Sequence, residues 1–203
     1  MVFPCKYTHF GYEFLSKVDL VTLHSGVDLN YGAPWEDKGL PVKAIADGVV
    51  VASYLSSPGW GNMVVLFHHK YKTWSRYAHL EKNFYKEGNQ VYEGDEIGTI
   101  GATGGNWSSH LHFDIIKKKL PSWTSYTKYW SNKKVRQYYV DPMEYIRGIQ
   151  KQEDQKEEDQ TVSPIHRPGA DWCIENKITS GARPRDGATR EEVWTMLKRL
   201  HEL

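Results

Sequence analysis

Short apolar runs separated by turn residues dominate the chain up to Ile116. Strands of this spacing, with no long helices between them, are typical of an antiparallel sandwich or barrel. The pattern therefore predicts a mainly β fold built on compact antiparallel sheets. The predicted strands are Pro41–Ala46, Val49–Tyr54, Asn62–His68, Thr73–His79, Ile97–Ile100 and a last run that ends at Ile116.

A polar run divides the chain after this β-rich part. Gln150–Gln160 contains no apolar residue, so burial cannot offset the entropy lost on ordering it. We expect a linker or a solvated helical extension there, preceded by a short helix at Met143–Ile149. The predicted organisation is a domain at 1–149, a charged linker at 150–164 and a small module at 165–203.

The C-terminal module is predicted to be α-helical. Ala170–Lys177 reads as one helix, and Thr189-Arg190-Glu191-Glu192 has the Thr-x-x-Glu spacing of a capping box that starts a second. Two helices in about forty residues are marginal alone. We therefore expect the module to dock on another surface or to self-associate.

Charge and composition exclude several functions. The chain has 26 basic and 25 acidic residues, a net charge of +1, which argues against a nucleic-acid partner. No run approaches the roughly 18 apolar residues of a membrane span, and no signal peptide is visible at the N-terminus. We therefore expect synthesis in the cytoplasm without membrane insertion. Cys5 and Cys173 form no C-x-x-C pair, which favours two free thiols over a disulfide framework.

The stretch Lys117–Tyr139 interleaves aromatic and basic residues. Such a patch is suited to stacking on sugars or bases. A long surface loop held in place by its aromatic side chains fits the pattern equally well, and the sequence leaves both readings open.

Five residues stand out as candidate chemistry. His110 and His112 are two apart, so on a strand both imidazoles would point to one face. His24 and Asp28 are four apart, and His79 is a further candidate. Zinc hydrolases typically use three His or carboxylate ligands and keep one position open. Four histidines and one aspartate therefore suit three ligands plus two catalytic imidazoles, since a histidine exchanges protons near neutral pH.

In order and context these residues resemble the lysostaphin/LytM-type zinc metallopeptidases, which are peptidoglycan endopeptidases. The likeness runs from about His24 to Pro142. The motifs that carry it are His24-x-x-x-Asp28, Tyr77-Ala78-His79-Leu80, His110-Leu111-His112-Phe113, Pro41-Val42-x-Ala44, Gly94-Asp95-x-Ile97-Gly98 and Val140-Asp141-Pro142.

The resemblance implies one zinc ion bound by His24, Asp28 and His112. It also implies that His79 and His110 are the catalytic pair and that bacterial peptidoglycan is the substrate. The chain departs from the family pattern in three places: Trp107-Ser108-Ser109 stands for a small-Gly-Pro tripeptide, Asp114 stands for Glu, and Lys117–Tyr139 is an insertion.

The module at 165–203 resembles a shortened S-layer-homology repeat, which implies binding to a cell-wall polymer. A docking or dimerising helix pair is the alternative. With a lytic domain and no signal peptide, the whole resembles a phage endolysin released by a holin, or a virion-associated lysin. Two other classes remain open: a non-catalytic wall-binding or activator module, and a structural virion protein with local wall-trimming activity.

Deletion of residues 165–203 tests the wall-binding hypothesis. We expect the shortened protein to sediment less with purified cell walls than the full chain. Equal sedimentation of the two proteins would contradict this role for the module.

Overall fold

The structure, a computed structural model, describes residues 1–54 and 59–159. The chain divides into two units, Met1–Lys151 and Gln152–Leu203. The module predicted at 165–203 lies outside the described residues.

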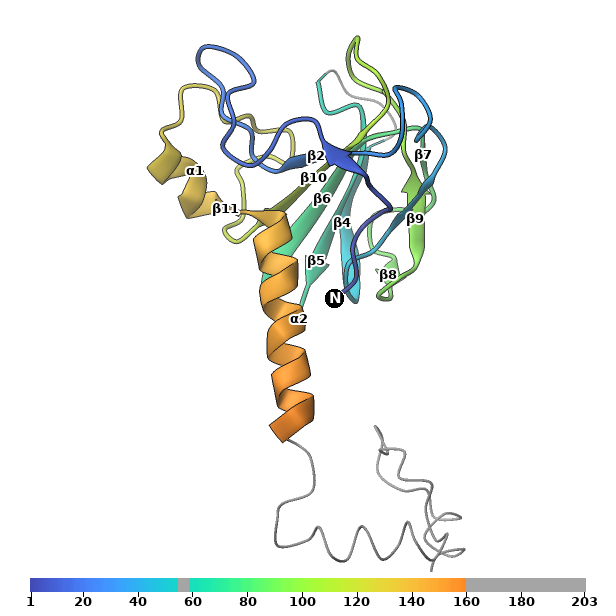
Figure 1. Cartoon of the computed structure of the whole chain (residues 1–203), viewed down its shortest axis with the longest axis vertical. Helices are drawn as coiled ribbons and strands as arrows, with labels where there is room; N and C mark the ends of the chain where they lie inside the picture. Colours follow the sequence, from blue (N-terminus) through green and yellow to red (C-terminus); the bar gives the residue numbers. More distant parts are fainter. Residues whose placement is uncertain (55–58, 160–203) are drawn as a thin grey trace, which may run out of the picture. The chain divides into compact units, whose positions relative to one another are not determined.

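A large antiparallel sheet forms most of the first unit (Figure 1). Its strands, in spatial order, are β1 (His9–Phe10), β2 (Val27–Asn30), β10 (Leu111–Ile116), β6 (Thr73–Leu80), β5 (Asn62–His68), β4 (Gly48–Tyr54) and β8 (Gln90–Val91), and β11 (Tyr139–Val140) also pairs with β10. The mainly β, antiparallel fold predicted from the sequence is confirmed.

A second, smaller sheet helps to close the core. It consists of β3 (Pro41–Lys43), β9 (Glu96–Thr99) and β7 (Lys82–Asn83). Alternate residues of a strand point to opposite faces, and one face of each sheet supplies the main hydrophobic cluster. Tyr77 and Phe113 of the large sheet share that cluster with Val42 and Ile97 of the small one. The opposite face of the large sheet carries polar side chains beside two smaller apolar clusters.

Two helices lie near the end of the described chain, and neither is long and apolar enough to cross a membrane. Helix α1 (Asn132–Tyr138) falls in the stretch for which the sequence suggested a loop or a patch. Helix α2 (Pro142–Asp159) starts where predicted, because Asp141 Oδ1 accepts the backbone N–H of Met143 at 2.9 Å. It continues beyond Ile149 through Gln, Lys and Glu, which favour helix, so the expected helical extension is present up to Asp159.

One further histidine, His68, is buried away from the polar face of the large sheet. His68 is fully buried. Its Nδ1 lies 2.9 Å from the Asp47 carbonyl oxygen, and its Nε2 lies 2.7 Å from Ser75 Oγ. Burial lowers the pKa of His68 below its usual value, although its hydrogen bond to Asp47 opposes the shift.

This buried imidazole makes stability depend on pH. The folded protein binds fewer protons at His68 than the unfolded chain, whose histidines titrate near 6.5. The free energy of unfolding should therefore fall as pH drops below about 6.5, by up to about 1.4 kcal/mol per pH unit from this group. Urea unfolding of His68→Leu from pH 7.5 to 5 should give a shallower slope than wild type. Parallel slopes would contradict the prediction.

Candidate active site

Strand register places the predicted site residues on the polar face of the large sheet. In β10, His112 stands opposite Asp28 of β2 on one side and opposite Ala78 of β6 on the other. Asp114 stands opposite Arg76. Residues opposite each other in antiparallel strands share a face, so these side chains gather above the sheet. As expected from alternation, Leu111 and Phe113 point into the core.

A glycine brings the segment of His24 close to β10. Gly26 lies just before β2, and a Cβ atom there would overlap the carbonyl oxygen of Phe113. Only glycine permits this approach of two backbones. His24 is thereby brought beside His112, with ring centroids 4.7 Å apart.

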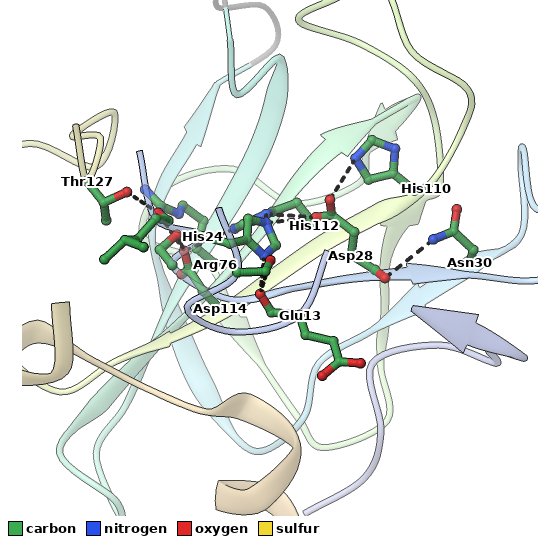
Figure 2. Close-up of polar contacts among 12 residues, drawn as sticks. Glu13, His24, Asp28, Asn30, Arg76, His110, His112, Asp114 and Thr127 are labelled. Atoms are coloured by element: carbon green, nitrogen blue, oxygen red, sulfur yellow. Dashed lines mark hydrogen bonds and ion pairs between the residues drawn. The ribbon is translucent and has the colours of Figure 1, made fainter. Parts of the chain in front are cut away.

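Three ligand-type atoms meet at one point (Figure 2). His24 Nε2 lies 2.9 Å from His112 Nδ1, and each of these nitrogens lies 3.1 Å from Asp28 Oδ1. Three ligands at about 2.0–2.1 Å from a tetrahedral zinc ion are about 3.3 Å apart. The spacing of the three atoms therefore approaches that of one face of a zinc coordination sphere.

In His24 and His112, the contact made by the second ring nitrogen shows which nitrogen carries the proton. His24 Nδ1 is 3.3 Å from the carbonyl oxygen of Glu13, and His112 Nε2 is 3.2 Å from Asp114 Oδ2. Carbonyl and carboxylate oxygens only accept hydrogen bonds, so a neutral ring carries its proton on that side. Both rings then turn a lone pair toward Asp28. Three acceptors facing one another need a cation between them.

The pKa shifts agree with this demand for positive charge. Burial would raise the pKa of Asp28, but the His112 and His24 rings beside it hold it well below its usual range. Burial would lower the pKa of His112, but the Asp114 and Asp28 carboxylates beside it raise it. Both shifts favour a positive charge where the three atoms meet.

A β-bulge turns His79 toward the same point. In β6, Ala78 and His79 together stand opposite Met63, because pairing passes from Asn62–Leu80 to Val64–Tyr77. Without the extra residue, alternation would point His79 to the core side. The bulge coincides with a left-handed backbone at His79 (φ +63°), which is unusual for a non-glycine residue. Bulges of this kind re-aim side chains beside active sites.

His79 and His110 form a second pair of imidazoles, with ring centroids 4.7 Å apart. His79 Nδ1 lies 2.9 Å from the Thr103 carbonyl oxygen, and His110 Nδ1 lies 2.9 Å from that of Ser108. Each neutral ring therefore keeps its proton on Nδ1 and has a lone pair on Nε2. Burial, with the charges of His110 and His112, lowers the pKa of His79 to about 3.

The five residues line a mainly apolar cleft of about 310 Å³, and the stretch 117–139 forms part of its wall. Trp60 Nε1 donates to the Thr124 carbonyl at 3.1 Å, and the Tyr126 ring stacks on Trp60 at 5.2 Å. Thr127 Oγ1 donates to the Leu23 carbonyl (Figure 2). Contacts of its aromatic side chain and backbone therefore hold this part of the stretch in place at the wall of the cleft.

Two side chains of this site were not predicted from the sequence. Arg76 is fully buried beside Asp114, and its guanidinium lies 3.7 Å from the centroid of the Trp60 ring. An arginine in the middle of a strand with buried neighbours was the available signal, because such a charge needs a buried partner. Trp60 carried no comparable signal, since its partners come from distant segments.

Comparison with known proteins places this site in a family context. The model of peptidase family M23 matches residues 22–123. The DD-carboxypeptidase/endopeptidase Mpg of Neisseria meningitidis serogroup B is 37% identical over 115 residues, which are 55% of this chain and 25% of that protein. Lysostaphin of Staphylococcus staphylolyticus is 38% identical over 105 residues, covering 51% and 20% of the two chains. The matches thus span a quarter or less of these relatives' lengths.

Solved structures agree with the fold. The catalytic domain of lysostaphin from Staphylococcus simulans superposes with a TM-score of 0.54 at 29% identity, over 68% of this chain and 92% of that domain. The structure of LytU gives a TM-score of 0.52 at 25% identity, over 70% and 87% of the two chains.

The close approach at Gly26 leads to a stability prediction. Gly26→Ala should lower the free energy of unfolding by about 1–3 kcal/mol, because the new methyl group must displace the Phe113 carbonyl. Gly148→Ala, in α2 with no atom within 4 Å of the new methyl, is the matched control and should stabilise by up to about 1 kcal/mol. Urea denaturation measures both, and equal effects would refute the steric argument.

Proposed function

The chain belongs to peptidase family M23, and from this premise we propose that it is a zinc-dependent endopeptidase of bacterial peptidoglycan. One observation carries the proposal. Three convergent acceptor atoms, from His24, Asp28 and His112, lie beside two further imidazoles in a single cleft.

The donor set fits zinc. Two imidazoles and one carboxylate are the ligand types of catalytic zinc sites, which leave a further position for water or substrate. A zinc ion bound there supplies Lewis acidity, polarising a carbonyl oxygen and lowering the pKa of water to about 7. His24, Asp28 and His112 would hold it. Their outer partners, the Glu13 carbonyl and the Asp114 carboxylate, orient the two rings.

His79 and His110 are suited to moving protons in this cleft. Each presents an unprotonated Nε2, because its Nδ1 proton is held by a backbone carbonyl. We assign them to proton transfer from the attacking water to the leaving amine. Once protonated, the same rings stabilise the charge that develops on the peptide oxygen. The low pKa of His79 keeps its ring neutral at neutral pH, with the lone pair on Nε2 unprotonated.

Two sources support peptidoglycan as the substrate. The names of the relatives describe peptidoglycan DD-endopeptidases in Vibrio cholerae and a DD-carboxypeptidase/endopeptidase in Neisseria. Apart from the five site residues, the cleft is lined by uncharged side chains, among them Val18, Leu23 and Tyr126. Such walls suit short, uncharged peptide side chains better than charged ones.

The place of action is a further part of the proposal. We propose that the protein acts on the cell wall after holin-type release, or as part of a virion, and that residues 165–203 bind a wall polymer. Deletion of residues 165–203 tests the binding role. Neighbouring holin genes would favour holin-type release, and neighbouring tail genes would favour a virion protein.

Mass spectrometry of digested peptidoglycan tests the proposed activity. New peptide termini should appear with the protein and identify the bond that is cut. They should vanish with a zinc chelator and in His112→Ala, because a metal ligand is lost. If walls of several cross-link types stay intact while the protein still sediments with them, the non-catalytic binding module is the better account.

A second experiment should distinguish the metal-binding histidines, His24 and His112, from the proton-transfer histidines, His79 and His110. His79→Ala and His110→Ala should keep stoichiometric zinc yet lose about 10²–10⁴ in turnover, as expected for general acid–base groups. His24→Ala should lose the zinc itself. Loss of zinc in His110→Ala would contradict the division of roles.

A further inference from the structure

A buried ion pair lies directly behind the metal-ligand set. Arg76 and Asp114 are both fully buried, and the Arg76 guanidinium donates to Asp114 Oδ2 (Figure 2). Removing two charges from water is costly unless their geometry and hydrogen bonds are good. A fully buried pair of this kind is therefore stable only if further hydrogen bonds fix its geometry.

The contacts of Asp114 converge on one oxygen. Besides Arg76, Oδ2 receives the Ser25 hydroxyl at 2.9 Å and lies 3.2 Å from His112 Nε2. Oδ1 has no hydrogen-bond partner within residues 1–54 and 59–159. The carboxylate is thus aimed at the imidazole, and the other two donors hold it in that position.

Arg76 is itself fixed by groups around the cleft. It donates to the Trp123 carbonyl at 2.6 Å, and its guanidinium covers the Trp60 ring at 3.7 Å. Trp60 in turn contacts the His112 ring edge-on, with centroids 4.9 Å apart. His112 is therefore held on two sides by one cluster, made of Arg76, Asp114 and Trp60.

These contacts determine the tautomer and the ring orientation of His112. A proton shared with Asp114 must sit on His112 Nε2, so Nδ1 keeps its lone pair for the metal. Flipping the ring would bury an Nε2 acceptor and place C–H beside the carboxylate, which loses the hydrogen bond. A negative charge on Asp114 also makes the imidazole a stronger donor to a cation.

We propose that Asp114 and Arg76 are positioning residues that fix the tautomer and orientation of His112 for metal binding. The proposal rests on the proposed function, since it concerns the zinc that His24, Asp28 and His112 would share. Arg76 acts through Asp114, and Asp114 acts through His112. Neither touches the substrate.

Zinc affinity, measured by competition with a chromophoric chelator, tests the proposal without any assay of activity. Asp114→Asn can place its oxygen at the Oδ2 position and its amide at the unpartnered Oδ1 position, so it keeps an acceptor and loses the charge. We expect about tenfold weaker zinc binding. Asp114→Ala loses acceptor and charge, and we expect a loss closer to a hundredfold.

Ser75→Ala is the matched control. Ser75 precedes Arg76 in β6, is equally buried and points to the other face, where it contacts His68. Its loss removes a buried hydrogen bond without reaching the metal ligands. Zinc affinity should match wild type even if the melting temperature falls, which separates positioning from general destabilisation.

A second variant covers the case in which Arg76, left without a partner, prevents folding. The double variant Arg76→Met with Asp114→Asn removes both charges, and it too should bind zinc at least tenfold more weakly than wild type. Wild-type affinity in any folded Asp114 variant would overturn the proposal. Failure of every Asp114 variant to fold would also overturn it, because the Arg76–Asp114 pair would then be required for folding. A wild-type protein that binds no zinc would instead refute the proposed function itself.

Discussion

Three hydrogen-bond acceptors that face one another at 2.9–3.1 Å are the constraint on which the site depends. Two imidazole lone pairs and a carboxylate oxygen repel unless positive charge lies between them. The fold holds them together because the β2–β10 register places Asp28 beside His112, and because Gly26 brings His24 to the same edge. A metal ion removes this conflict, so the same contacts that look unfavourable alone become a binding site.

Two groups of distant residues complete the site around this point. The bulge in β6 turns His79 out of the core and beside His110, at the cost of a left-handed backbone at His79. The stretch 117–139 contributes Tyr126 and Thr127 to the cleft wall, and its Thr124 carbonyl accepts a hydrogen bond from Trp60. Arg76 joins this stretch to the metal-ligand set, since it binds both the Trp123 carbonyl and Asp114, the partner of His112. The cleft wall and the metal ligand are therefore parts of one hydrogen-bonded unit.

Much of this arrangement was predictable from local pattern. Alternation alone placed His110 and His112 on one face and put Leu111 and Phe113 in the core, because a strand has a strict period of two. The antiparallel β fold followed from short apolar runs and turn residues. The five candidate residues meet in the structure, although the sequence offered only their spacing and a family resemblance.

Other features depend on tertiary contacts that local pattern does not contain. The bulge at His79 exists only relative to Met63 on the next strand, so alternation alone would place its side chain on the core face. The role of Arg76 depends on Asp114, which is 38 positions away. Helix α1 was missed because its stretch offered a single well-buried apolar residue, Val135, among basic and aromatic neighbours.

A crystal structure of the zinc-loaded protein, with anomalous scattering recorded on both sides of the zinc edge, tests the central claim most directly. The account predicts one anomalous peak about 2.0–2.2 Å from His24 Nε2, Asp28 Oδ1 and His112 Nδ1, with His79 and His110 outside the coordination sphere. A peak elsewhere in the cleft, or His79 or His110 as a ligand in place of one of the three, would contradict it.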